Sequence, residues 1–424
     1  MIKKLNLNNE FAKNVFTLMF GTALAQVIPF LLSPIISRLY TPDSFGKYSL
    51  FMSISGILAI LATGKYEMAI ILPKYDKYAF HLVLLSSILT LSFSLIILII
   101  LFPLKFIFKF ENLYFILPFV VFAIGLNYVF DRFNNRIKNY KLMSIQRLIK
   151  SIAESVVSIS FAIFLKNSLG LIWGFAIGYI CSNLVMIFIN YKNFKNLKYS
   201  KVILKTVSKK YINFPKYTLP HSLLNTLSSQ IPIYLIPFFF TSNELGFYSF
   251  GLRMVQTPLS LISQSFFNVI GQKFAEEHAN GKSLLPLFKS TLKKLSLLAI
   301  ATIPFFIFAP QIFGFVFGKR WIEAGKYVQL LSPFIIISFI ASPFSNIFFI
   351  FNKQNVGLLV EITNTIIKIC VFLLISKFNN INLLILIYSI SSSVIIFFAL
   401  IYIYKLCKKK NRLLDKNSKE PKRY

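Results

Sequence analysis

Arg253 is the residue whose type and setting most clearly predict binding chemistry, because it lies inside a mainly apolar stretch. It follows Gly246 by seven residues, roughly 10 Å along a helix at about 1.5 Å per residue. A guanidinium offers a planar fork of donors that suits a phosphate or pyrophosphate. The alternative is that the side chain extends outward to the membrane surface. Residues at helical spacing from Arg253 are Gln256, Ser260, Ser263 and Gln264, which predicts one polar stripe with Arg253 and Gln256 as substrate-binding candidates.

A second candidate is the pair Lys65 and Glu67, at the end of the helix expected over 46–63. A basic and an acidic residue two positions apart do not face each other on a helix. We therefore expect each residue to pair with another helix, at a gate on the inner face of the membrane. The alternative is an ordinary interfacial cluster of charges.

Glu154 and Glu361 are the candidates for ion coupling. Arg147 and Glu154 lie seven residues apart in one expected helix, and Glu361 and Lys368 lie seven apart in another, with the charges reversed. A buried Glu whose pKa is raised by desolvation can carry a proton. Structural salt bridges between the two halves are the alternative. His221 is a third titratable candidate, although a single His beside Pro is more often structural.

Two expected helices carry prolines at equivalent places in the two halves of the chain. Each proline frees a backbone carbonyl that needs a wet or polar neighbour. Interrupted helices at matching positions point to a transport site, although Pro is also common in membrane helices. The first helix holds Gln26, Pro29 and Pro34, and the seventh holds Pro220, His221, Asn225, Ser228, Ser229, Gln230, Pro232 and Pro237. Gln26, Asn225 and Gln230 are therefore further candidates for substrate binding.

The composition is that of an all-α, polytopic membrane protein. The chain has 424 residues, of which 56% are hydrophobic and 14% charged, and its mean hydropathy is +0.68. The net charge is +32, but Lys and Arg lie in short loops between apolar runs, which argues against a nucleic-acid partner. The three cysteines have no pairing or metal spacing, so we expect no disulfide, metal site or cofactor.

Enzyme motifs are absent from the sequence. There is no P-loop, no H-E-x-x-H and no G-x-S-x-G. We therefore expect a transporter rather than an enzyme, driven by an ion gradient or by the gradient of its own substrate.

About twelve membrane-spanning helices are expected, because a span needs about 20 mainly apolar residues. The first is expected to be a retained helix rather than a signal peptide. Six helices per half predict two lobes, residues 1–205 and 206–405. A basic cytoplasmic linker over 191–216 ends the first lobe, and a basic cytoplasmic tail over 406–424, expected to be disordered, follows the second. The spans are expected near 15–37, 46–63, 79–103, 113–130, 148–165, 169–190, 217–240, 246–270, 295–317, 327–351, 356–376 and 381–404.

A short motif recurs two hundred residues apart. The stretch LYTPDSFGKYSLF, residues 39–51, is echoed by FFTSNELGFYSFG, residues 239–251. Thr41, Gly46, Tyr48 and Ser49 recur at the same spacing in the second copy, and each copy lies between two apolar runs. The repeat predicts two equivalent hairpins, each with a polar turn closed by the Gly, and two lobes related by a parallel pseudo-two-fold axis.

The distribution of basic residues predicts the orientation in the membrane. Most Lys and Arg residues fall in the N-terminal segment, in alternate loops, in the 191–216 linker and in the tail. Because cytoplasmic loops are enriched in Lys and Arg, both termini are expected in the cytoplasm.

Several stretches resemble the Wzx-type polysaccharide flippases, which translocate the lipid-linked oligosaccharides of O-antigen and capsule. These proteins belong to the multidrug/oligosaccharidyl-lipid/polysaccharide exporter (MOP) superfamily. The segment over 21–51 resembles the family's first hairpin, and GKYEMAIILP, residues 64–73, resembles the basic-aromatic-Glu end of its second helix. Residues 246–276 resemble its eighth helix, and FGKRWIEAGKYVQLLSP, residues 317–333, resembles the stretch before its tenth.

The resemblance implies a twelve-helix, two-lobed fold with a central cationic cavity. It implies a short glycan on undecaprenyl pyrophosphate, such as the O-antigen unit of lipopolysaccharide, moved from the inner to the outer leaflet of the bacterial inner membrane by alternating access. Lys65 and Glu67 stand where the family has its basic-x-Glu pair, and Arg253 where it has a basic residue in the eighth helix. Few basic residues lie deep in the spans, unlike the several lumen arginines of many members. The expected partners are membrane lipid and a polysaccharide polymerase or assembly complex, with the monomer as the functional unit.

Two other classes of function compete with this interpretation. A multidrug or cation antiporter of the same superfamily would need a more acidic lumen than the deep charges predict. An integral membrane glycan polymerase or glycosyltransferase would need a catalytic loop outside the membrane, usually a long one, and the expected outer loops are short. Related peptidoglycan-precursor flippases usually have fourteen helices, two more than are expected here.

Overall fold

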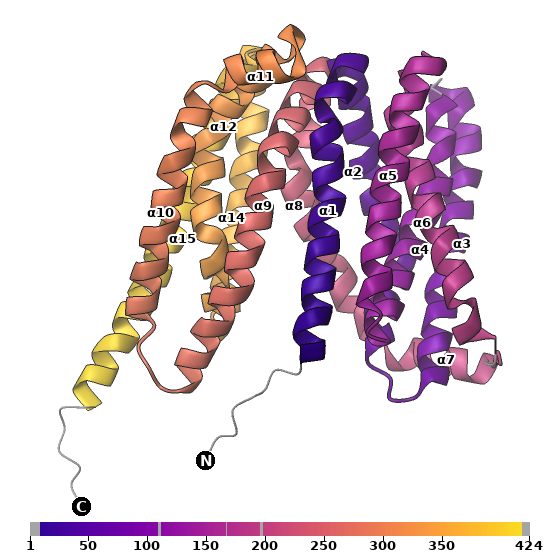
Figure 1. Ribbon diagram of the computed structural model, residues 1–424, viewed down its shortest axis with the longest axis horizontal. Coiled ribbons are helices and arrows are strands. Elements are labelled where there is room, and N and C mark those ends of the chain that lie inside the picture. The colour runs from indigo at the N-terminus through magenta and orange to yellow at the C-terminus, as the bar shows by residue number, and fades with distance from the viewer. Residues whose placement is uncertain (1–8, 109–111, 167, 196–197, 418–424) are drawn as a thin grey trace, which may run out of the picture. The chain divides into compact units, whose positions relative to one another are not determined.

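The structure is a computed structural model that describes residues 9–108, 112–166, 168–195 and 198–417 (Figure 1). These residues are mostly helical and contain no strand, which confirms the predicted all-α class. Internal contacts divide the chain into two units, Met1–Ile233 and Tyr234–Tyr424, which are described in turn. The lobe boundary predicted between residues 205 and 206 remains a prediction.

The first unit contains the first six expected spans and the linker that follows them. The linker predicted over 191–216 includes a helix of its own, α7, which the sequence pattern did not reveal. The elements in chain order are α1 (Asn9–Leu39), α2 (Pro42–Thr63), η1 (Tyr66–Ile71), α3 (Asp76–Phe108), η2 (Asn112–Ile116), α4 (Leu117–Arg136), α5 (Tyr140–Phe164), α6 (Gly170–Phe194), α7 (Lys201–Lys210), η3 (Phe214–Thr218) and α8 (Leu219–Phe239), the last of which continues across the division.

The second unit ends in one long helix. The elements are α9 (Ser242–Ala279), α10 (Leu285–Ile307), α11 (Ala309–Phe317), η4 (Lys319–Trp321), α12 (Ile322–Ala341), η5 (Ser342–Ser345), α13 (Asn346–Ile350), α14 (Gln354–Ile375), η6 (Ser376–Phe378) and α15 (Ile381–Asn417). The prediction of a disordered tail is wrong for residues 405–417, which continue α15. The helix continues there because its apolar face still finds a core, in which Cys407 is fully buried. Residues 418–424 lie outside the described residues.

Each expected span overlaps at least one helix, although α10 begins at Leu285, well before the span expected over 295–317. In the described part of the chain, nine helical stretches are long and apolar enough to cross a membrane. The other three expected spans correspond to α5, α8 and α9, whose polar residues lower their hydropathy. Two expected spans are divided: 295–317 between α10 and α11, and 327–351 among α12, η5 and α13. The chain is therefore a multi-pass membrane protein with about twelve membrane helices.

The repeated motif forms two equivalent helix starts. Thr41 caps α2 by accepting a hydrogen bond from the backbone N–H three residues on, at 3.3 Å. Thr241 caps α9 in the same way at 3.4 Å, and the Glu244 carboxylate accepts the Thr241 N–H in return at 2.7 Å. The prediction that Gly46 and Gly246 close the turns is wrong, because both helices begin four residues earlier and include the glycines.

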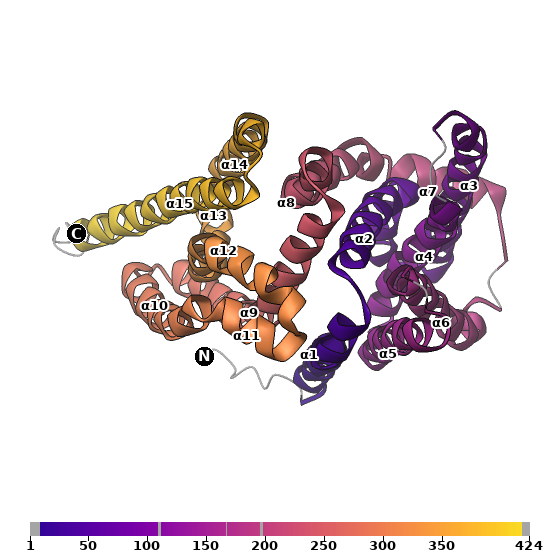
Figure 2. The ribbon, with the colours of Figure 1, turned by 90° about the horizontal axis from the view of Figure 1, so that it is seen from above.

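In the first unit, α5 lies between α1 and α6 (Figure 2). Gly170, Gly174 and Gly178 recur every fourth residue on α6, a pattern that lets membrane helices approach closely. A Cβ at Gly178 would lie 2.9 Å from the Lys150 carbonyl oxygen, and one at Gly174 would overlap the Ser158 hydroxyl. The close approach of α6 therefore sets where the polar residues of α5 lie.

We expect Gly174→Ala to destabilise the first unit, because the added methyl group has no space between α5 and α6. Overpacking of this kind costs about 1–3 kcal/mol, which should lower the melting temperature in detergent by several degrees. Gly56→Ala is the matched control, since a Cβ there meets no atom within 4 Å. Equal melting temperatures for the two variants would contradict the tight α5–α6 contact.

The second unit packs α9 against α12 and against Trp321 of η4, the short helix before α12. The ring centroids of Phe250 and Trp321 lie 4.2 Å apart, and Trp321 is fully buried. Gly251 leaves room for the Ala324 carbonyl oxygen, which would lie 2.9 Å from a Cβ at that position. This packing covers one face of α9 and leaves the Arg253 side chain half-buried on another.

Candidate functional site

Lys65 and Glu67 form an ion pair, with Lys65 Nζ 3.6 Å from Glu67 Oε1. The expectation that each would pair with another helix is wrong, and the backbone explains why. Gly64 and Lys65 both adopt left-handed conformations, with φ of 57° and 60°, so α2 ends and Lys65 is not helical. Glu67 then enters the interior on η1, with its side chain only 3% exposed.

Two tyrosines of the first unit lie between the Lys65–Glu67 ion pair and α5. Lys65 Nζ lies 5.9 Å from the centroid of the Tyr128 ring on α4. Tyr128 interacts electrostatically with Glu67 and with Tyr179 of α6. Tyr179 in turn lies beneath the Lys150 ammonium of α5, with Nζ 4.0 Å from the ring centroid, a close cation–π contact.

Glu154 is the far end of this arrangement. Lys150 Nζ lies 4.0 Å from Glu154 Oε2, one turn along α5. The Tyr48 hydroxyl of α2 donates a 2.8 Å hydrogen bond to Glu154 Oε1. Contacts, and for Tyr128 electrostatic interactions, thus connect residues of α2, η1, α4, α5 and α6. We call this set the polar track: Lys65, Glu67, Tyr128, Tyr179, Lys150, Glu154 and Tyr48.

Sequence reasoning identified Lys65, Glu67 and Glu154 but did not connect them. Tyr48 was noted only as part of the repeated motif. Lys150 was readable as the i, i+4 partner of Glu154, and the glycines of α6 were readable as a close-packing pattern. Tyr128 and Tyr179 carry no local pattern, because their role depends on which helices meet.

Several buried polar atoms near these helices lack hydrogen-bond partners among the described residues. They include Glu67 Oε2, the Ser155 hydroxyl and both amide atoms of Gln146, two turns before Ser155 on α5. Unpaired buried polar groups are costly, and ordered water commonly satisfies them. The first unit therefore has the polar interior that internal water requires.

The segment η1 is held in place from two sides. Tyr66 donates a 3.0 Å hydrogen bond to the Ser208 carbonyl of α7, and burial raises the pKa of the Tyr66 phenol. Arg136 of α4 donates to the Pro73 carbonyl at 2.5 Å and pairs with Asp76 at 2.8 Å. These contacts fix the short segment that carries Glu67.

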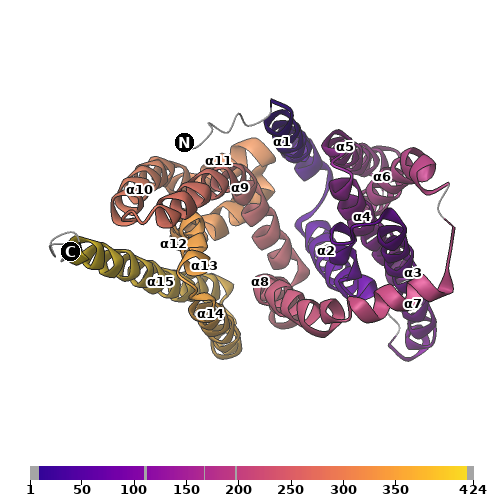
Figure 3. The same cartoon turned by 90° about the horizontal axis from the view of Figure 1, so that it is seen from below.

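His81 anchors the start of α7, which lies against α3 (Figure 3). His81 is fully buried, and its Nδ1 lies 2.6 Å from the Lys77 carbonyl oxygen. A carbonyl only accepts, so Nδ1 carries the proton and Nε2 accepts the Ser200 N–H at 2.9 Å. The predicted linker is thus tied to the first unit at both ends of α7.

Arg253 heads a polar stripe on α9, as predicted. Its side chain is half-buried, while Gln256, Ser260 and Gln264 on the same face are exposed. The opposite face of α9 is buried, as at Met254 and Val255. Arg253 and Gln256 are therefore neighbours on a face of α9 that is less buried than the face with Met254 and Val255.

The charged pairs of α5 and α14 differ from the expected arrangement. Arg147 does not bind Glu154; it contacts the Thr22 hydroxyl and lies 3.3 Å from the Asp131 carboxylate. In α14, Glu361 is exposed and interacts electrostatically with Lys368. Lys368 is the buried member of that pair, with its side chain among the core residues of the second unit.

In the second unit, the tyrosine of the repeated motif lies in a different setting, near α15. Tyr248, the counterpart of Tyr48, is buried and interacts electrostatically with Tyr388 of α15. Lys368 Nζ lies 5.9 Å from the Tyr388 ring centroid. The motif tyrosine therefore leads to Glu154 in the first unit and to a buried lysine in the second.

The remaining candidates lie on α1 and α8. Gln26 is half-buried, and its Oε1 has no hydrogen-bond partner among the described residues. His221 and Asn225 are exposed one turn apart, and Gln230 is half-buried. The expectation of interrupted first and seventh helices is wrong, because α1 continues through Pro29 and Pro34 and α8 continues through Pro232 and Pro237.

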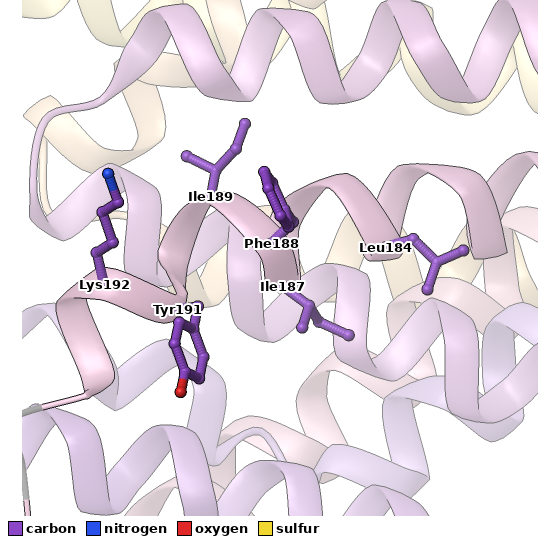
Figure 4. Close-up of a pocket in the computed structure, with 6 residues that line it drawn as sticks. All are labelled: Leu184, Ile187, Phe188, Ile189, Tyr191 and Lys192. Atoms are coloured by element: carbon purple, nitrogen blue, oxygen red, sulfur yellow. The ribbon is translucent and has the colours of Figure 1, made fainter.

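A groove of about 650 Å³ lies elsewhere, on α6 (Figure 4). It is lined by Leu184, Ile187, Phe188, Ile189, Tyr191 and Lys192, side chains that project from one helix. None of the predicted site residues lines it. Its apolar lining fits a surface that faces lipid.

Comparison with protein families gives one match. Residues 35–326 match the family described as polysaccharide biosynthesis protein. The chain belongs to this family. The match includes Lys65, Glu67, Glu154 and Arg253. A comparison with curated protein sequences finds no match.

The fold of this polysaccharide biosynthesis protein is that of the MOP superfamily. An inward-facing multidrug resistance MATE family transporter is 16% identical, with a TM-score of 0.64 over 93% of this chain and 99% of that one. A MOP superfamily transporter from Pyrococcus furiosus is 14% identical, with a TM-score of 0.58 over 95% and 96% of the two chains. A mutant of the Vibrio cholerae MATE transporter VcmN is 15% identical, with a TM-score of 0.59 over 96% and 98%.

The family match identifies a polysaccharide biosynthesis protein, and the solved structures show that its fold is like that of MOP superfamily transporters. The resemblance to Wzx-type MOP flippases is confirmed at this level, as is the polytopic all-helical class. At 14–16% identity the solved structures bear on the fold alone.

Proposed function

We propose that the protein is a flippase for a lipid-linked oligosaccharide. It moves an undecaprenyl-pyrophosphate-linked glycan, such as an O-antigen or other surface polysaccharide unit, from the inner to the outer leaflet of the bacterial inner membrane by alternating access. Family membership supports the substrate class. The observation in this chain that supports the proposal is the half-buried Arg253, which begins a stripe of exposed polar residues on α9.

Arg253 suits the charged part of such a substrate. A pyrophosphate that leaves water for a low-dielectric layer needs a cation already in place. Gln256 on the same face supplies an amide group that can bind a sugar hydroxyl. Gln26, Asn225 and Gln230 remain predicted substrate-binding residues. The Pyrococcus furiosus transporter is described with a binding pocket of reverse polarity that suggests a different function. A cationic face here accords with an anionic substrate.

The polar track supports coupling to protons. Glu154 receives a hydrogen bond from Tyr48 and lies beside Lys150, so its charge state alters two defined contacts. Tyrosine hydroxyls and internal water can relay a proton between Glu67 and Glu154, at the two ends of the polar track. Glu154 is therefore the proposed coupling residue. Glu361 and His221 are weaker candidates, because both are exposed.

We expect both termini and the linker that contains α7 to lie in the cytoplasm, because these segments are rich in lysine. Ser200 is a poor labelling site, since its side chain caps α7 and its N–H binds His81. Lys205→Cys is a better one, because the side chain is exposed. In a background lacking Cys181, Cys370 and Cys407, this cysteine should react only after the inner membrane is permeabilised. Reaction from the periplasmic side of intact cells would contradict the proposed orientation.

A deletion strain tests the proposed function. Loss of the protein should abolish display of the surface glycan and leave the lipid-linked unit inside the cell. Loss of a polymerase would instead leave single glycan units on the surface. A drug antiporter would change drug susceptibility and leave the glycan intact, and either of these outcomes would contradict the proposal.

We further propose that the monomer functions beside a polysaccharide polymerase or assembly complex.

A further inference from the structure

The start of α10 and the end of α15 are packed together. The ring centroids of Phe288 and Tyr404 lie 6.0 Å apart, and both helices contribute to one buried core that includes Phe288, Ile403 and Cys407. Lys289 directly follows the first ring and Lys405 directly follows the second. These two lysines therefore lie on neighbouring helices at the same end of the unit.

The basic character extends along both helices. The exposed lysines here are Lys289, Lys293 and Lys294 on α10, and Lys405, Lys408 and Lys409 on α15. We call this set the lysine edge. No acidic residue occurs on α10, and none occurs on α15 before Asp415. No ion pair between described residues includes any of the six lysines, whereas Lys326, for example, pairs with Glu323 at 2.8 Å.

On both α10 and α15, the lysine edge adjoins an exposed apolar face of the kind that contacts lipid. Leu297 and Leu298 of α10 are 58% and 43% exposed, and each lies four residues after Lys293 or Lys294. On α15, Phe397 is 53% exposed and lies eight residues before Lys405. At a rise of about 1.5 Å per residue, each helix changes from apolar to lysine within roughly 6–12 Å. That change is expected where hydrocarbon gives way to headgroups.

We propose that the lysine edge binds the headgroup of an anionic phospholipid, whose acyl chains lie along the exposed apolar faces of α10 and α15. Clusters of basic residues beside the ends of membrane helices attract such headgroups. Six exposed cations, none of them in an ion pair with a described residue, attract anionic headgroups. The adjoining apolar faces favour a lipid over a free phosphate, because they give acyl chains a surface to contact. The site is separate from the polar track and from Arg253.

Native mass spectrometry of the full-length protein tests the proposal. Phosphatidylglycerol and phosphatidylcholine are added separately to the purified protein, and the adducts are counted. The Lys289→Gln/Lys405→Gln variant should bind phosphatidylglycerol at least tenfold more weakly and phosphatidylcholine unchanged. The control is Lys319→Gln/Lys377→Gln, which removes the same charge from exposed lysines of η4 and η6, away from the core that carries the lysine edge. It should bind within twofold of wild type.

Three results would overturn the proposal. The first is equal loss of phosphatidylglycerol in both variants, which would show only a net-charge effect. The second is full competition by glycerol phosphate, which would show a site for free phosphate. The third is preferential binding of undecaprenyl pyrophosphate, which would assign the lysine edge to the substrate. The melting temperatures of both variants are measured alongside, so that loss of folding is not scored as loss of binding.

Discussion

Arg253→Ala should reduce surface glycan display about 10- to 100-fold. A hydrogen bond to a charged group contributes about 1.5–3 kcal/mol, and each 1.4 kcal/mol is about tenfold in rate. Arg253→Lys keeps the charge but loses the bidentate fork, so partial activity should remain. Arg253→Glu should abolish display by repelling the pyrophosphate. Complementation of a deletion strain at matched protein levels measures all three.

The same series separates the two interpretations of Arg253. If the guanidinium only extends to the membrane surface, removing it should be harmless, because the membrane gains by losing a charge. Gln264→Ala is a suitable control, since it lies three turns further along the same exposed stripe and carries no charge. Wild-type display from Arg253→Ala would show that Arg253 does not bind the anion.

Glu154→Gln should cause a loss of comparable size. The amide still accepts the hydrogen bond from Tyr48, so packing is retained, but it cannot exchange a proton. Display should fall more than tenfold, and the remaining transport should no longer respond to a proton gradient. Tyr48→Phe removes only the hydrogen bond and should give a smaller loss.

Glu361→Gln is the matched control for Glu154→Gln, because it makes the same chemical change at an exposed position of the second unit. Its display should stay within twofold of wild type. If Glu154→Gln and Glu361→Gln reduced surface display equally, the position of Glu154 in the polar track would not set its function apart from that of Glu361. Unchanged proton dependence in Glu154→Gln would remove Glu154 from the coupling step.

Local features of the fold were predictable from the sequence. Thr41 and Thr241 cap α2 and α9, because each side-chain oxygen accepts a hydrogen bond from the backbone N–H three residues later. This contact is local and does not depend on distant residues. The spans were predictable because hydropathy reports their membrane environment directly. The helix of α15 beyond residue 405 was missed, since its basic composition hides the apolar residues that pack against α10.

The site was predictable only in part. The Lys65–Glu67 pair depends on two left-handed residues, of which only Gly64 is a type that favours that conformation. Tyr128 and Tyr179 join the polar track through the packing of α4 and α6, which no local pattern encodes. From their spacing alone, Glu154 and Glu361 were equal candidates for ion coupling. Their burial distinguishes them, since Glu154 is half-buried and Glu361 is exposed, and burial depends on how the whole unit packs.

Flipping by the purified protein is the most direct measurement. Proteoliposomes that contain the wild-type protein and a fluorescent undecaprenyl-pyrophosphate-linked oligosaccharide are treated with a membrane-impermeant reagent that quenches the exposed glycan. Wild type should expose the whole glycan pool to the reagent over time, faster with an imposed proton gradient, while Arg253→Ala should protect the inner-leaflet half. Protection of half the pool by the wild-type protein, equal to that in empty liposomes under every gradient, would contradict a flippase.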